Sequence, residues 1–112
     1  MEIGKIDCGA ELILCPVDER IGEIKLKVRP VPPDFEIPAD ADVKAQLKAI
    51  GSLIVGWNFE KDGVVVPCND ETKEQYLWHL VRIMVKGDGG ATEPLAGPVV
   101  KFATDIENFL GN

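Results

Sequence analysis

The sequence has little of what most catalytic and metal-binding sites need. It contains one histidine and three cysteines among 112 residues, and aromatic residues make up only 6% of the chain. These residues are Cys8, Cys15, Cys68 and His79. They do not form the closely spaced pairs by which short loops present ligands to zinc. We therefore expect no metal, no cofactor and no catalytic residue in this chain.

Long apolar runs are also lacking. No stretch approaches the roughly 18 to 20 consecutive apolar residues that a membrane-spanning helix needs. Residues 1–8 alternate charged and apolar types and lack the apolar core of a secretory signal. The odd number of cysteines, in a chain large enough to fold without disulfides, favours a reducing compartment. We expect a cytoplasmic protein that has no membrane partner.

Positive charge is scarce: the chain has 12 lysines and arginines but 19 aspartates and glutamates, which gives a net charge of −7. The electrostatic field of an acidic protein repels phosphate backbones, so nucleic acid is not an expected partner. The hydrophobic share of 46% is too high for a disordered chain. A chain of this length forms one hydrophobic core, so residues 1–112 are expected to be a single domain.

Two segments near the start of the chain have the patterns of β-strands. Residues 11–16 are short and mostly apolar, and residues 23–29 alternate charged and apolar types with a period of two. The apolar side of the second segment consists of Ile24, Leu26 and Val28. Its lysines line the other face, as is common in an edge strand. Four prolines then make residues 30–38 an extended connector.

The middle of the chain predicts a helix and a hairpin. The helix covers residues 41–50, with Asp40 as its N-cap and Gly51 as a left-handed stop. Its apolar stripe is Val43, Leu47 and Ile50. Strands over residues 53–59 and 63–67 then surround an Asp-Gly turn, which supplies the positive φ that short hairpin loops require.

The last third predicts two more helices. Asn69 caps the first, over residues 70–86, which carries an apolar stripe. The stripe comprises Leu77, Leu80, Val81 and Met84, broadened by Tyr76, Trp78, Ile83 and Val85. The glycine-rich residues 87–90 connect this helix to a final one over residues 96–110.

These elements together predict an α+β fold. Four strands, at residues 11–16, 23–29, 53–59 and 63–67, form a small and mostly antiparallel sheet. The three helices pack on one face of it.

Three aromatic residues are the candidate partner-contact residues: Trp57, Trp78 and Tyr76. Aromatic anchors dominate the energetics of protein interfaces, although the same side chains are equally suited to a core. A Cys68–His79 nucleophile and base pair is geometrically conceivable across the start of a helix, but no motif for an oxyanion hole accompanies it. The acidic pairs at the predicted helix starts are explained by capping and by the helix dipole.

Residues 53–77 read LIVGWNFEKDGVVVPCNDETKEQYL. This block resembles small proteins of tailed phages and prophages, in which an apolar strand ends in a Trp and an Asp-Gly hairpin leads to a Pro and a capped helix. The matching positions are Trp57, Asp62-Gly63, Pro67 and the helix from about Asn69. The family is the tail assembly chaperone-like group, and the resemblance extends over about residues 22–86.

The resemblance implies a non-enzymatic protein of phage morphogenesis in the bacterial cytoplasm. Its expected partners are tail proteins, either the tape measure protein or the tube protein. The resemblance also allows the protein to form a homo-oligomer. The apolar face of residues 76–85 is expected to cover apolar stripes of the partner. The strand before residue 16 and the connector at residues 87–90 depart from the family pattern and leave a tail terminator or head-tail joining role open.

A small acidic inhibitor or immunity-type module that binds a basic protein is the alternative, and an enzyme is the third hypothesis. The acidic residues are scattered along the sequence, which speaks against the inhibitor.

Overall fold

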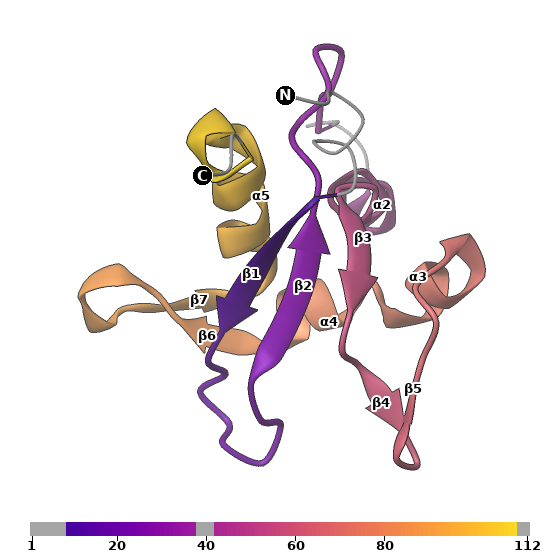
Figure 1. The fold of residues 1–112 in the computed structure, drawn as a ribbon, viewed down its shortest axis with the longest axis vertical. Helices are drawn as coiled ribbons and strands as arrows, with labels where there is room; N and C mark the ends of the chain where they lie inside the picture. Colours follow the sequence, from indigo (N-terminus) through magenta and orange to yellow (C-terminus); the bar gives the residue numbers. More distant parts are fainter. Residues whose placement is uncertain (1–8, 38–41, 110–112) are drawn as a thin grey trace.

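A computed structural model of the protein describes residues 9–37 and 42–109. Its main sheet is antiparallel and has the strand order β1-β2-β3, formed by β1 (Ala10–Leu14), β2 (Ile24–Val28) and β3 (Ile54–Trp57). Figure 1 shows this sheet in front, with α4 and the β6–β7 hairpin passing behind it. Small antiparallel sheets and helices thus form the predicted α+β fold.

The central strand of the main sheet is β2. Its three apolar residues are almost fully buried, whereas Lys25 and Lys27 between them are exposed, as the period-two pattern predicts. The prediction that this strand lies at an edge is wrong, because β1 and β3 pair with its two sides. The lysines are exposed because one whole face of the sheet is open to solvent.

The helix α2 (Val43–Gly51) follows the proline-rich connector, and the side chain of Asp42 caps it by accepting a hydrogen bond from the N–H of Ala45. The predicted cap, Asp40, lies outside the described residues. Gly51 is not a left-handed stop, because it is the last helical residue. It allows close packing instead: a Cβ atom there would lie 2.6 Å from Cδ2 of Leu77, so that side chain would have to shift.

The predicted Asp-Gly hairpin is present as β4 (Glu60–Lys61) and β5 (Val64–Val65). Asp62 and Gly63 at its tip have φ values of 55° and 80°, as a tight hairpin turn requires. The segment 53–59 is not one strand, however. Its first part joins the main sheet as β3, and the chain then leaves to form the hairpin as a separate two-stranded sheet.

The single helix predicted over residues 70–86 is wrong. The chain forms α3 (Asp70–Tyr76), α4 (His79–Arg82) and then a strand, β6 (Met84–Lys86), which pairs with β7 (Thr92–Pro94). Residues 84–86 form a strand instead of a helical turn because they also pair with the residues that follow β1. The N–H of Lys86 donates to the carbonyl of Cys15 at 3.1 Å, and the N–H of Val17 donates to the carbonyl of Met84 at 2.9 Å.

The broken helix changes two further expectations. Residues 87–90 turn the chain between the strands β6 and β7, with a short 3-10 helix at Asp88–Gly90, and do not connect two helices. Leu77 and Leu80 are buried as predicted, whereas Val81 and Met84 are each 38% exposed. There is therefore no continuous helical apolar face over residues 76–85.

The chain ends with α5 (Ala96–Thr104) and a 3-10 helix at Ile106–Asn108, in place of one helix over residues 96–110. Val99 and Ala103 are buried against the main sheet and α2, and Phe109 is buried as well. Leu110 lies outside the described residues. Among the helices of residues 9–37 and 42–109, none has the length and apolar content needed to cross a bilayer.

Candidate functional site

Four aromatic rings form a cluster where β3, the β4–β5 hairpin and the helices α3 and α4 meet. They belong to Trp57, Phe59, Tyr76 and His79, and we call them the aromatic cluster. Ring centroids lie 5.1 Å apart for Trp57 and Phe59, 5.7 Å for Trp57 and Tyr76, and 5.3 Å for Tyr76 and His79. These separations are typical of attractive aromatic pairs.

The sequence positions the cluster through a few polar contacts. Trp57 ends β3 and points its indole at the hairpin, where Nε1 donates to the carbonyl of Val66 at 2.6 Å. The N–H of Val66 in turn donates to the carbonyl of Phe59 at 2.8 Å. The bond from Trp57 ties the end of the hairpin to β3, whereas the bond from Val66 to Phe59 closes the hairpin itself. The ring of Phe59 then lies beside that of Trp57.

The helix α3 brings Tyr76 to the cluster. Asn69 and Thr72 form a reciprocal capping box at its start, and the Thr72 hydroxyl also donates to the carbonyl of Pro67 at 2.5 Å. The first turn carries Asp70 and Glu71, which the helix dipole favours. A short helix with no buried residue is therefore held by its cap and by the aromatic contacts at its far end.

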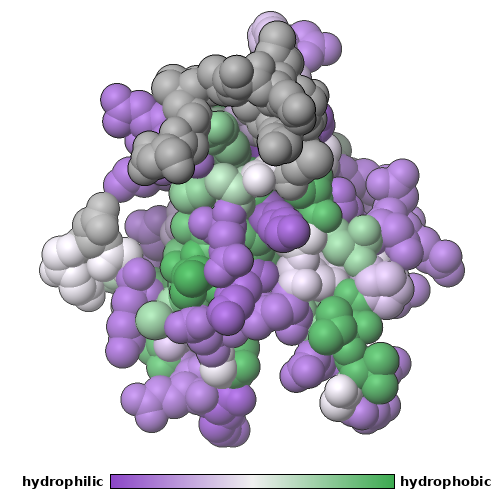
Figure 2. All heavy atoms as spheres, viewed as in Figure 1, coloured by the Kyte–Doolittle hydropathy of each residue, from purple (hydrophilic) through white to green (hydrophobic). Residues whose placement is uncertain are grey.

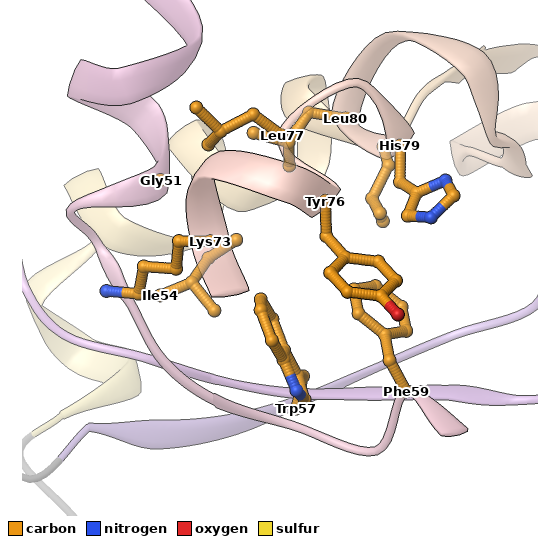
Figure 3. Close-up of a pocket in the computed structure, with 10 residues that line it drawn as sticks. Gly51, Ile54, Trp57, Phe59, Lys73, Tyr76, Leu77, His79 and Leu80 are labelled. Carbon is orange, nitrogen blue, oxygen red and sulfur yellow. The ribbon is translucent and has the colours of Figure 1, made fainter. Parts of the chain in front are cut away.

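The inner side of the cluster is filled. Figure 3 shows the rings of Trp57, Phe59 and Tyr76 together with Leu77, Leu80 and Ile54. The space that remains between them is about 10 Å³. A cavity must offer about this volume to hold even one water molecule. The inner side is therefore part of the protein interior and not a ligand pocket.

The outer side of the cluster faces an open groove of about 570 Å³. Phe59, Tyr76, His79 and Ile83 form its floor, and Ile21, Gly22, Glu23, Ile24, Asn58 and Glu60 line the rest of it. Figure 2 shows the molecule hollowed at its lower edge, between the β1–β2 connection and the β4–β5 hairpin. This volume lies in the range of sites that bind small ligands or several side chains.

Asn58 creates the groove. Its Oδ1 accepts a hydrogen bond from the N–H of Lys25 at 2.9 Å, and its Nδ2 donates to the carbonyl of Glu23 at 3.0 Å. These are backbone groups of the β2 edge that a longer β3 would have paired. Because a side chain replaces the backbone there, the chain after Trp57 turns away from β2 and leaves space between them.

The charges that line the groove are negative. Glu23 and Glu60 are the ionised side chains among its lining residues, and Lys25 approaches Glu23 only at 3.9 Å in an exposed pair. Burial of the His79 ring lowers its pKa from the usual 6.5, and the nearby Arg82 guanidinium lowers this pKa further. His79 is therefore neutral near pH 7 and adds no positive charge to the floor.

The three candidate partner-contact residues separate into two places. Trp57 and Tyr76 belong to the aromatic cluster and are partly buried, whereas Trp78 is 45% exposed at the start of α4. Sequence reasoning did not include Phe59 and Asn58 in the site. Asn58 interrupts the apolar run of residues 53–57 directly before Phe59, but this interruption does not indicate which groups its side chain bonds.

Cys68 and His79, the conceivable nucleophile and base pair, contact different parts of the protein. The thiol of Cys68 lies 4.0 Å from the carbonyl of Ile54, and its burial raises its pKa despite the nearby Lys73. The ring of His79 packs against aromatic rings instead. Within residues 9–37 and 42–109, no three histidine, cysteine or acidic side chains are grouped so that they could hold a metal ion. Cys8 lies outside these ranges.

Comparisons with known proteins give no relative of this chain: no family model, curated protein or solved structure matches it.

Proposed function

We propose that this protein is a non-enzymatic factor of phage or prophage tail assembly, similar to the tail assembly chaperones, and that it acts through protein contacts. The observation that carries the proposal is the open groove beside an apolar hairpin. Val64 and Val65 in the hairpin are 69% and 54% exposed, and the groove beyond them has an aromatic floor. Apolar surface left open in this way is typical of protein interaction sites.

The residues that resemble the tail assembly chaperone-like group lie around this surface. Trp57 holds the hairpin through Val66, the Asp62-Gly63 turn forms its tip, and Pro67 is bonded to the capping box of α3. One short block of sequence thus builds both the exposed valines and one wall of the groove. This local arrangement supports a role in which the block itself contacts a partner.

The charge distribution also supports such a role. A tape measure protein is long and helical with exposed apolar stripes, so its companion needs an apolar contact surface and a soluble exterior. The net charge of −7 supplies the second property, and the hairpin with the groove supplies the first. A cytoplasmic assembly factor has both needs.

Co-expression with the tape measure and tail tube proteins of the same phage or prophage tests the proposal. We expect one of them to co-purify with the wild-type chain, and much less of it with the Val64→Thr/Val65→Thr variant. Threonine keeps the β-branched shape and removes apolar surface.

The matched control is Ile13→Thr/Val17→Thr, which changes two β-branched apolar side chains of similar exposure, 51% and 45%. Both residues lie outside the hairpin and outside the lining of the groove. This control should co-purify as well as the wild type. If the wild type binds no tail component, the proposed function is wrong.

A further inference from the structure

We propose that the groove receives the side chain of a lysine or an arginine from an otherwise apolar segment of the partner. This inference rests on the proposed function only in taking the partner to be a protein. It concerns the outer side of the aromatic cluster, whose lining combines two features: aromatic rings in the floor and two carboxylates with no lysine or arginine among the lining residues.

The first feature is the floor. Phe59 and Tyr76 lie nearly parallel, with centroids 6.2 Å apart, and His79 meets both of them. Aromatic faces attract lysine and, more often, arginine cations within about 6 Å of the ring centroid. The aliphatic part of either side chain would contact Ile83 and Ile21, which also line the groove.

The second feature is charge. Glu23 and Glu60 both line the groove, one directly before β2 and the other in the first strand of the hairpin. Glu60 has no ion pair with any described residue, and Glu23 has only the exposed one with Lys25. Since the pKa of His79 is lowered, no groove-lining group opposes a cation near pH 7.

The two features together select the occupant. A purely apolar segment would desolvate Glu60, which has no ion pair with a described residue, and Glu23, whose one ion pair is exposed, and this is unfavourable. An acidic segment would be repelled by them and by the net charge of −7. A cation in the groove would be attracted by both carboxylates and by the aromatic rings that line it, so an apolar segment with one lysine or arginine fits best.

The direct test uses defined peptides with the full-length protein. The probe is a fluorescein-labelled peptide of the sequence Ala-Leu-Leu-Arg-Leu-Leu-Ala, compared with the same peptide in which citrulline replaces arginine. Citrulline keeps the shape of arginine and removes its charge. We expect the arginine peptide to bind about tenfold more tightly, to shift the NMR signals of the His79 ring, and to weaken as salt is raised.

The variant for this test is Glu23→Gln/Glu60→Gln, which should reduce binding of the arginine peptide about tenfold and leave the citrulline peptide unchanged. The matched control, Glu11→Gln/Glu36→Gln, makes the same change in net charge at exposed glutamates that do not line the groove. Equal affinity for both peptides would overturn the inference. So would an equal loss in both variants, because net charge alone would then explain the binding.

Co-purification of a tail component separates this inference from the proposed function. Loss of that component in Glu23→Gln/Glu60→Gln but not in the control supports the inference. Equal recovery with the wild type and both variants overturns it and leaves the proposed function standing. Selective binding of the arginine peptide in the groove, with no tail component bound, supports the inference and contradicts the proposed function.

Discussion

Replacing Asn58 by alanine tests how the groove is built. The side chain makes two hydrogen bonds to the backbone of β2, at 2.9 Å to the N–H of Lys25 and at 3.0 Å to the carbonyl of Glu23. A typical hydrogen bond contributes about 1 kcal/mol net. Because the two backbone groups gain access to water in the variant, we expect Asn58→Ala to lower the free energy of unfolding by about 1 to 2 kcal/mol.

Urea unfolding and thermal unfolding, each followed by circular dichroism and tryptophan fluorescence, measure this change. The melting temperature should fall by about 4 to 8 °C, since 1 kcal/mol corresponds to about 4 °C or more in a domain of this size. Asn58→Asp keeps an acceptor for Lys25 but places a second carboxylate oxygen against the carbonyl of Glu23. It should therefore be at least as unstable as Asn58→Ala at pH 7.

The control is Asn108→Ala, which removes one exposed hydrogen bond to the carbonyl of Phe102 far from the groove. We expect it to change stability by no more than about 0.5 kcal/mol. If Asn58→Ala is as stable as the control, or if Asn58→Asp is as stable as the wild type, then Asn58 does not replace strand pairing as argued above.

Three further predictions concern other parts of the fold. Gly51→Ala should lower the free energy of unfolding by about 1 kcal/mol, because the clash with Leu77 exceeds the gain in helix propensity. Stability should fall as the pH drops from 6.5 toward the lowered folded-state pKa of His79, because the unfolded chain binds the proton more strongly there. Iodoacetamide at pH 8 should modify the exposed Cys15 about tenfold faster than the partly buried Cys68, whose pKa is raised.

Each of these has its own control. Gly51→Ser should be no more stable than Gly51→Ala, and a gain in stability by either would show that the clash is relieved. His79→Gln should remove the fall in stability just below pH 6.5, and an unchanged pH profile would contradict the assignment. The alkylation rates are read by mass spectrometry in a Cys8→Ser background, and equal rates at the two thiols would contradict the burial of Cys68.

The sequence was sufficient where a short segment decides its own structure. The alternation in residues 23–29 predicted the buried face of β2, and the Asp-Gly pair predicted the hairpin turn. Asn69 was also correctly identified as a helix cap. In each case the deciding contacts lie within a few residues along the chain.

The sequence was insufficient where distant segments compete for the same residues. Val85 fits a helical stripe over residues 70–86, yet it is fully buried as part of β6, opposite Pro16 and Glu93. The position of β2 in the middle of the sheet likewise depends on β3, which begins 26 residues after β2 ends. Tertiary pairing of this kind leaves no periodic signal in a single segment.

The same limit applies to the candidate site. Trp57, Trp78 and Tyr76 were predicted to contact a partner, and this stays a prediction. The groove itself depends on a side chain, that of Asn58, which bonds to residues more than 30 positions earlier. No local pattern indicates such a contact.

The attachment of the β4–β5 hairpin determines where local unfolding of this protein is expected to begin. A two-stranded ribbon is at best marginally stable alone. This one is attached through the indole N–H of Trp57, which bonds to Val66, and through the ring contacts of Phe59 with Trp57 and Tyr76. Its amide protons should therefore exchange with solvent well before those of β2. We expect the hairpin with the two exposed valines to open before the main sheet does, which would widen the groove while the core remains folded.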